Sequence, residues 1–67
     1  MTGGKVIGKC RARHNSEWTV YLLLADFDPK GMRIYKVQLV RAEGEAIEKF
    51  RGFKAEAYDS FANWINF

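Results

Sequence analysis

Basic side chains recur at odd-numbered positions near the start of the chain, a spacing that can present cations on one surface. The residues are Lys5, Lys9, Arg11 and Arg13, and no acidic residue lies among them. Successive side chains of a β-strand point to opposite faces, so these four would share a face. Lysine and arginine bind phosphate groups and acidic protein surfaces. The pattern therefore predicts a surface for an anionic partner.

Two later residues extend this predicted surface when the chain is folded into hairpins. Tyr21 would lie beside Lys9, where its ring could stack a nucleic-acid base or anchor a protein contact. Lys36 would continue the basic patch onto the next strand. A second interpretation stays open, because natural proteins often place charges on edge strands to prevent aggregation.

Two stretches have part of the spacing of a nucleotide-binding or metal-binding motif, but each lacks residues that the motif requires. Residues 3–10 have the G-x-x-x-x-G-K spacing of a phosphate-binding loop, but Cys10 replaces the Ser or Thr that would bind magnesium, and no strand precedes the loop. The start of a calcium loop at Asp26 is interrupted, since Lys30 and Val37 occupy ligand positions. We expect no cofactor and no metal.

Catalytic residues are not expected either. His14 is the only histidine, it lies in a polar loop, and no Ser or Cys partner completes a triad with it. Cys10 is expected to face the core as a small buried side chain rather than act as a nucleophile. The sequence therefore predicts a non-enzymatic protein.

Length and composition indicate one small globular domain over residues 1–67, with residues 1–4 as a frayed lead-in. Hydrophobic residues make up 48% of the chain and charged residues 28%, and the net charge of +3 arises from 11 basic and 8 acidic residues. The longest apolar run, Val20 to Ala25, is too short to span a membrane, and the N-terminus lacks the apolar segment of a signal peptide. With only one cysteine, these features predict a soluble cytoplasmic protein.

The basic residues would be positioned by a central β-hairpin. Its strands are predicted over residues 18–25 and 32–41, and Asp28 to Gly31 form the turn, because Pro29 presets its own φ and Gly31 tolerates a positive φ. The register that keeps the apolar side chains together pairs Phe27 with Met32, Leu24 with Tyr35, Leu22 with Val37 and Val20 with Leu39.

A first strand over residues 5–13 is predicted to pair with the hairpin through a short loop at residues 14–16. The expected pairs are Ala12 with Trp18, Cys10 with Val20, Gly8 with Leu22 and Val6 with Leu24. The predicted inner face then carries Val6, Cys10, Ala12, Trp18, Val20, Leu22, Leu24, Tyr35, Val37 and Leu39. The predicted outer face carries Lys5, Lys9, Arg11, Arg13, Thr19, Tyr21, Lys36 and Gln38, with Ile7, Leu23, Ile34 and Val40 among them.

The last third of the chain is predicted to add a strand and a helix. Residues 46–51 have helical propensity, but we interpret them as a fourth strand because they precede Gly52. Residues 54–66 carry an apolar stripe that predicts a helix lying on the inner face. The fold class is thus α+β, an antiparallel sheet of three to four strands in ββββα order with the C-terminal helix on one face. This order of elements is similar to that of single-strand-binding modules of the Pur-alpha and positive-cofactor types.

Two functional hypotheses follow. The first is binding of nucleic acid, with single strands favoured, through Lys5, Lys9, Arg11, Arg13, Tyr21 and Lys36 on the open face of the sheet. The alternative is a small phage-type inhibitor or adaptor, comparable to anti-CRISPR proteins, that binds an acidic or nucleic-acid-handling host protein. The apolar residues of the predicted outer face favour a protein interface, and they are also compatible with a homodimer.

Overall fold

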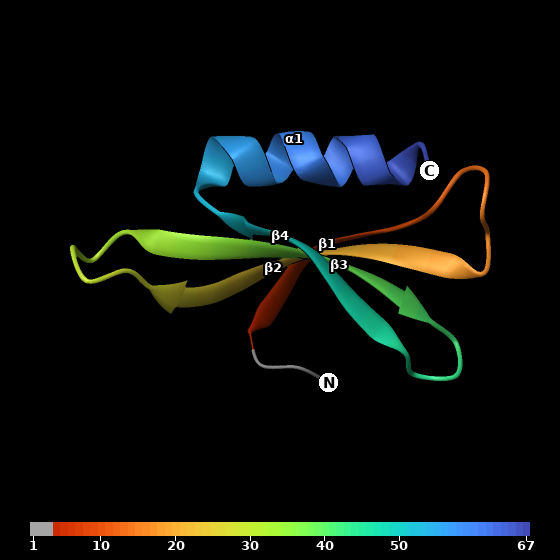
Figure 1. Ribbon diagram of the computed structural model, residues 1–67, viewed down its shortest axis with the longest axis horizontal. Helices are drawn as coiled ribbons and strands as arrows, with labels where there is room; N and C mark the ends of the chain where they lie inside the picture. Colours follow the sequence, from red (N-terminus) through yellow and green to blue (C-terminus); the bar gives the residue numbers. More distant parts are fainter. Residues whose placement is uncertain (1–3) are drawn as a thin grey trace.

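The chain folds as a four-stranded antiparallel meander with a helix lying across one face (Figure 1). The computed structural model describes residues 4–67, and the elements are β1 (Lys5–Arg11), β2 (Trp18–Phe27), β3 (Arg33–Arg41), β4 (Ala46–Gly52) and α1 (Lys54–Ile65). The predicted α+β class with ββββα order is confirmed, and residues 46–51 form a strand rather than a helix. The expected frayed lead-in falls mostly on residues 1–3, which lie outside the described residues.

The turn between β2 and β3 is built around Asp28. The Gly31 N–H donates to the Asp28 carbonyl at 2.9 Å, and Gly31 has a φ of 86°, as the sequence predicts for this turn. The Asp28 carboxylate also accepts hydrogen bonds from the N–H groups of Lys30 at 2.9 Å and Met32 at 2.8 Å. One side chain therefore satisfies two backbone donors that the tight turn leaves without strand partners.

Replacing Asp28 by Ala is expected to lower the free energy of unfolding by about 1 kcal/mol, since two exposed hydrogen bonds are lost while both donors regain water. For a domain of this size that corresponds to a fall in melting temperature of roughly 4–8 °C, measured by circular dichroism. Asp28→Asn, which keeps the acceptor oxygen, is the matched control. An equal loss in both variants would contradict the role of the acceptor.

The central pairing of the sheet follows the predicted register. Leu24 lies opposite Tyr35, Leu22 opposite Val37 and Val20 opposite Leu39. Toward the turn the predicted pairing of Phe27 with Met32 is wrong, because an irregularity between Leu24 and Phe27 places Phe27 opposite Arg33. The Arg33 guanidinium lies 4.3 Å from the centre of the Phe27 ring.

A β-bulge in β1 changes which side chains share a face. Cys10 pairs with Val20 and Gly8 with Leu22 as predicted, but Val6 pairs with Leu23 instead of Leu24. Because of the extra residue at Ile7, the side chains of Lys5 and Val6 lie on the faces opposite to those predicted by strict alternation. Gly8 permits a close approach here, since a Cβ at that position would lie 3.2 Å from the Phe61 ring of α1.

The core lies between the sheet and α1. Its buried residues are Ala12, Trp18, Val20, Leu22, Val37, Leu39 and Ala57, and Phe61, Trp64 and Ile65 of α1 pack against them. All but Ala57 belong to the predicted inner face. Tyr35 and Leu24 are only half-buried, and Val6 is excluded from the inner face by the bulge.

The prediction that Cys10 is buried is wrong. Its partner Val20 places it on the side of the sheet that carries α1, yet the residue is exposed. The reason is that β1 is an edge strand and the helix packs mainly over β2, β3 and β4. Cys10 is therefore left exposed at the edge of the sheet, whereas Ala12, two residues further on, is buried.

The C-terminal end of α1 is tied to the loop that follows β1. The Arg13 N–H donates to the Ile65 carbonyl at 2.7 Å, and the His14 N–H donates to the Phe67 carbonyl at 2.8 Å. Carbonyls in the last turn of a helix have no partner within the helix, so the loop supplies one. These bonds fix the helix over one face of the sheet, and within residues 4–67 no helix or strand lies on the opposite face.

Candidate anion-binding face

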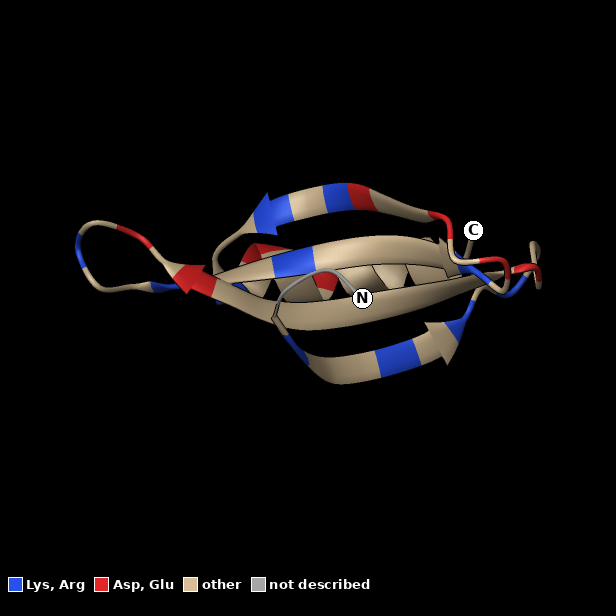
Figure 2. Cartoon of the chain, turned by 90° about the horizontal axis from the view of Figure 1, so that it is seen from below, with Lys and Arg blue, Asp and Glu red and all other residues tan. Residues whose placement is uncertain are grey.

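The outer face is defined here as the face of the sheet opposite α1. Figure 2 looks onto it and shows basic segments on β1, β3 and β4. Strand pairing places the following residues there: Val6, Lys9, Arg11, Thr19, Tyr21, Leu23, Lys36, Gln38, Val40, Ala46, Glu48 and Arg51. Four of the six residues predicted to bind a partner are among them, namely Lys9, Arg11, Tyr21 and Lys36.

Lys5 does not share this face. The bulge at Ile7 pairs Lys5 with Leu24, whose side chain belongs to the opposite side of the sheet together with Tyr35. The expectation that Lys5 lies alongside Lys9 is therefore wrong, because strict alternation fails at one inserted residue.

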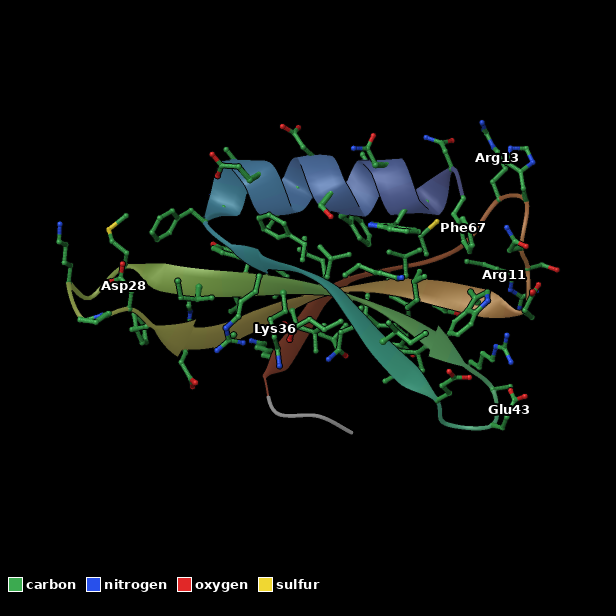
Figure 3. The ribbon with its side chains drawn as sticks, viewed as in Figure 1. Arg11, Arg13, Asp28, Lys36, Glu43 and Phe67 are labelled. Carbon is green, nitrogen blue, oxygen red and sulfur yellow. The ribbon has the colours of Figure 1, made fainter. Side chains whose placement is uncertain are left out.

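Arg13 is also diverted from the outer face. It lies beyond the end of β1, and its Nη1 donates to the Asn66 side-chain oxygen at 3.3 Å. Figure 3 shows Arg13 near Phe67 at the end of α1, well away from Lys36. The backbone bond to Ile65 explains this placement, since it turns residue 13 toward the helix.

Arg51 is a basic residue of the outer face that sequence reasoning missed. It pairs with Lys36 across β3 and β4, so two cations lie on adjacent strands. Its guanidinium lies 3.9 Å from the carboxylates of both Asp26 and Glu48. The signal that could have found it is the register of β4, but an irregularity between Val37 and Gln38 obscures that register in the sequence.

Tyr21 lies at the centre of one cationic region. It pairs with Lys9 on one side and Gln38 on the other, and the Lys9 ammonium lies 5.8 Å from the centre of its ring. That distance is within the range of a cation–π contact, so the two side chains support one another. A half-buried ring with an adjacent cation can stack a planar group while contacting an anion.

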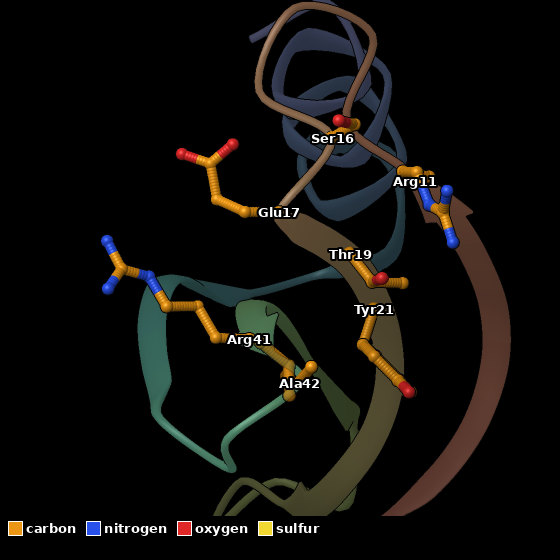
Figure 4. A pocket seen from close by; sticks show the side chains of 8 residues that line it. Arg11, Ser16, Glu17, Thr19, Tyr21, Arg41 and Ala42 are labelled. Carbon is orange, nitrogen blue, oxygen red and sulfur yellow. The ribbon is translucent and has the colours of Figure 1, made fainter.

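A hollow of about 340 Å³ opens beside Tyr21. Figure 4 shows Arg11, Thr19 and Tyr21 directed to the same side of β2, whereas the side chains of Glu17 and Arg41 extend away from them. The volume of this hollow is at the lower end of the range for small-molecule sites. A second hollow of about 170 Å³ lies at the other end of the face, between Lys36 and Arg51.

The apolar residues of the outer face are less available than the sequence suggests. Leu23 is only 1% exposed, and Val40 is half-buried. Gln38 is also buried. The expected apolar contribution from Leu23 is therefore absent, whereas Ile7 of β1 is 40% exposed and the cations Lys9, Arg11 and Arg51 are exposed.

Edge protection accounts for only part of the basic pattern. Lys9 and Arg11 lie on β1, an edge strand that carries both a bulge and charges, as aggregation-resistant edges do. Lys36 lies on β3, which is hydrogen-bonded on both sides and needs no such protection. Edge protection therefore does not explain why Lys36, on an inner strand, is basic.

The described part of the chain offers neither a metal-binding cluster nor a membrane-spanning helix. Across residues 4–67 there is no cluster of three His, Cys, Asp or Glu side chains that could hold a metal ion. In the same range, no helix has the length and apolar character needed to cross a membrane.

Comparison with known proteins gives no relative. The chain matches no family model, no curated protein and no solved structure. The similarity to single-strand-binding modules accordingly extends no further than the order of the elements.

Proposed function

We propose that the chain is a non-enzymatic binding protein that takes single-stranded nucleic acid across its outer face. The observation that carries the proposal is the position of Lys36. It lies on β3, an inner strand of the sheet, and on the same face as Lys9 and Arg11. Such an arrangement can follow a phosphate backbone across several strands rather than along one edge.

Tyr21 favours a single strand over a duplex. A base can stack on a half-buried ring only after it has left its own stack, and single strands offer such bases without the energy of unpairing. Reading a duplex requires a helix or a two-stranded ribbon that enters a groove, and the outer face is a broad sheet. The supporting feature is the hollow beside Tyr21, where a stacked base would have space.

The test is fluorescence-anisotropy titration of labelled single-stranded and duplex oligonucleotides of one length at several salt concentrations. Three phosphate contacts from Lys9, Arg11 and Lys36 predict a plot of log K against log salt with a slope of about −2 or steeper for the single strand. Tighter binding of the duplex would contradict the assignment to single strands. Absence of binding even at low salt would overturn the proposal.

A protein partner is the second candidate, and a different surface favours it. Phe27, Met32, Phe53 and Tyr58 are between 47% and 60% exposed. They belong to the β2–β3 hairpin end and the start of α1, which lie toward the same end of the molecule (Figure 1). Exposed aromatic residues of this kind anchor protein interfaces, as a phage-type inhibitor or adaptor would require.

The same residues would serve a homodimer, and sedimentation velocity over a range of concentrations tests this. A dimer that dissociates when Phe27 and Met32 are replaced by Ser would support self-association through the hairpin end.

The free thiol of Cys10 is exposed and suits a reducing compartment, so we place the protein in the cytoplasm as part of the proposal.

A further inference from the structure

Lys36 and Arg51 form a cationic cluster at the end of the outer face remote from Arg11. They lie opposite one another on β3 and β4, and both line the hollow of about 170 Å³, together with Gly4, Ala25 and Asp26. Figure 3 shows Lys36 near the middle of the sheet and Arg11 near its far end. The cluster is therefore separate from the hollow beside Tyr21.

The carboxylates that face Arg51 hold it weakly. Both contacts, to Asp26 and to Glu48, are 3.9 Å long, whereas a charge-assisted hydrogen bond is about 2.7–2.9 Å. The Asp26 side chain is 91% exposed, so water screens its attraction for the guanidinium. A phosphate group, which can accept two hydrogen bonds from one guanidinium, would compete well with either carboxylate.

The separation of the two regions suits one short strand of nucleic acid. Arg11 pairs with Thr19 and Arg51 with Lys36, which in turn lies opposite Leu23. The two arginines are therefore about 13 Å apart along the strands and about 14 Å apart across them. A diagonal path would pass Tyr21, which lies between these rows.

We propose that Lys36 and Arg51 form a second phosphate subsite for the strand that Lys9 and Arg11 bind, and that Asp26 and Glu48 occupy Arg51 until phosphate displaces them. This inference rests on the proposed function. It makes Arg51 a specificity-determining residue, because only a ligand long enough to span the face gains the energy of both ends. The site would be of the order of four nucleotides, the short end of the range for single-strand-binding domains.

Removing Arg51 is the first arm of the test. Arg51→Gln is expected to weaken binding of a short single-stranded oligonucleotide by about fivefold to tenfold at low salt and to make the salt slope shallower by about 0.7, the value for one lost contact. Lys54→Gln is the matched control, since it removes the same charge from the start of α1 on the other side of the sheet. Far-UV circular dichroism checks that both variants fold.

The second arm of the test removes the carboxylate of Asp26, which competes with phosphate for Arg51. Asp26→Asn is expected to tighten binding by about threefold relative to Glu43→Gln, which makes the same charge change in the β3–β4 turn. The loss caused by Arg51→Gln should be smaller for a single nucleotide, because it can bind beside Tyr21 without contacting Arg51.

The outcomes separate this inference from the proposed function. If the wild type binds with a steep salt slope but Arg51→Gln behaves like Lys54→Gln, the second subsite is overturned and the function of the outer face stands. If Arg51→Gln weakens binding while Asp26→Asn matches Glu43→Gln, the subsite stands and the competition is overturned. If the wild type binds no single strand at any salt concentration, both proposals fall.

Discussion

Reversing the charge of Lys9 and Arg11 together, as Lys9→Glu/Arg11→Glu, is expected to weaken binding of a single-stranded oligonucleotide by roughly a hundredfold at low salt. Each side chain is exposed on β1 and has no carboxylate within salt-bridge distance among the described ion pairs. The reversal removes two phosphate contacts and adds repulsion at the same positions. Lys9→Glu also removes the cation above the Tyr21 ring. Anisotropy titration measures the dissociation constant and its salt dependence.

The control for this prediction has the same total charge. Lys30→Glu/Lys54→Glu changes two exposed lysines, one in the β2–β3 turn and one at the start of α1, neither of them on the outer face. We expect this variant to weaken binding by no more than about fivefold through the long-range field. Equal losses in the two double variants would mean that net charge, rather than the outer face, determines binding.

Truncating Leu23 to Ala is expected to lower the free energy of unfolding by about 2–3 kcal/mol, a loss typical of a buried leucine. Leu23 is 1% exposed although it lies on the outer face, between Val6 and Lys36. A domain of this length has a total stability of only about 3–10 kcal/mol, so the variant would be substantially destabilised. Urea denaturation followed by circular dichroism measures the change.

Ile34→Ala provides the comparison, because Ile34 is half-buried on β3 and should cost less. A Leu23→Ala variant as stable as the wild type would show that this part of the outer face is open in solution. The prediction also changes how partner assays are designed. Leu23 is unsuitable as a probe of a protein interface, since its truncation acts on folding first.

Much of the fold follows from two regular features of the sequence. The Asp28 to Gly31 turn and the two-residue alternation of Val20, Leu22 and Leu24 determine the central register, because a slip by one residue would place Lys36 in the core. The large apolar side chains of the inner face then determine which face of the sheet the apolar stripe of α1 covers.

The candidate site was harder to predict because bulges shift register by single residues. An extra residue at Ile7 moves Lys5 to the other face, and the irregularity near Lys49 helps to bring Arg51 opposite Lys36. The alternation of apolar and polar residues in the sequence does not reveal such insertions, although Gly8 marks a position where one is tolerated. The exposure of Cys10 depends on how far α1 extends over β1, which local patterns do not encode.

The hydrogen bonds between the loop after β1 and the end of α1 join residues far apart in the sequence. The donors belong to Arg13 and His14, and the acceptors to Ile65 and Phe67. These two amide protons can exchange with solvent only when the helix end separates from the loop. Their exchange rates, compared with those of the β2 amides, therefore report how often the helix undocks while the sheet stays folded.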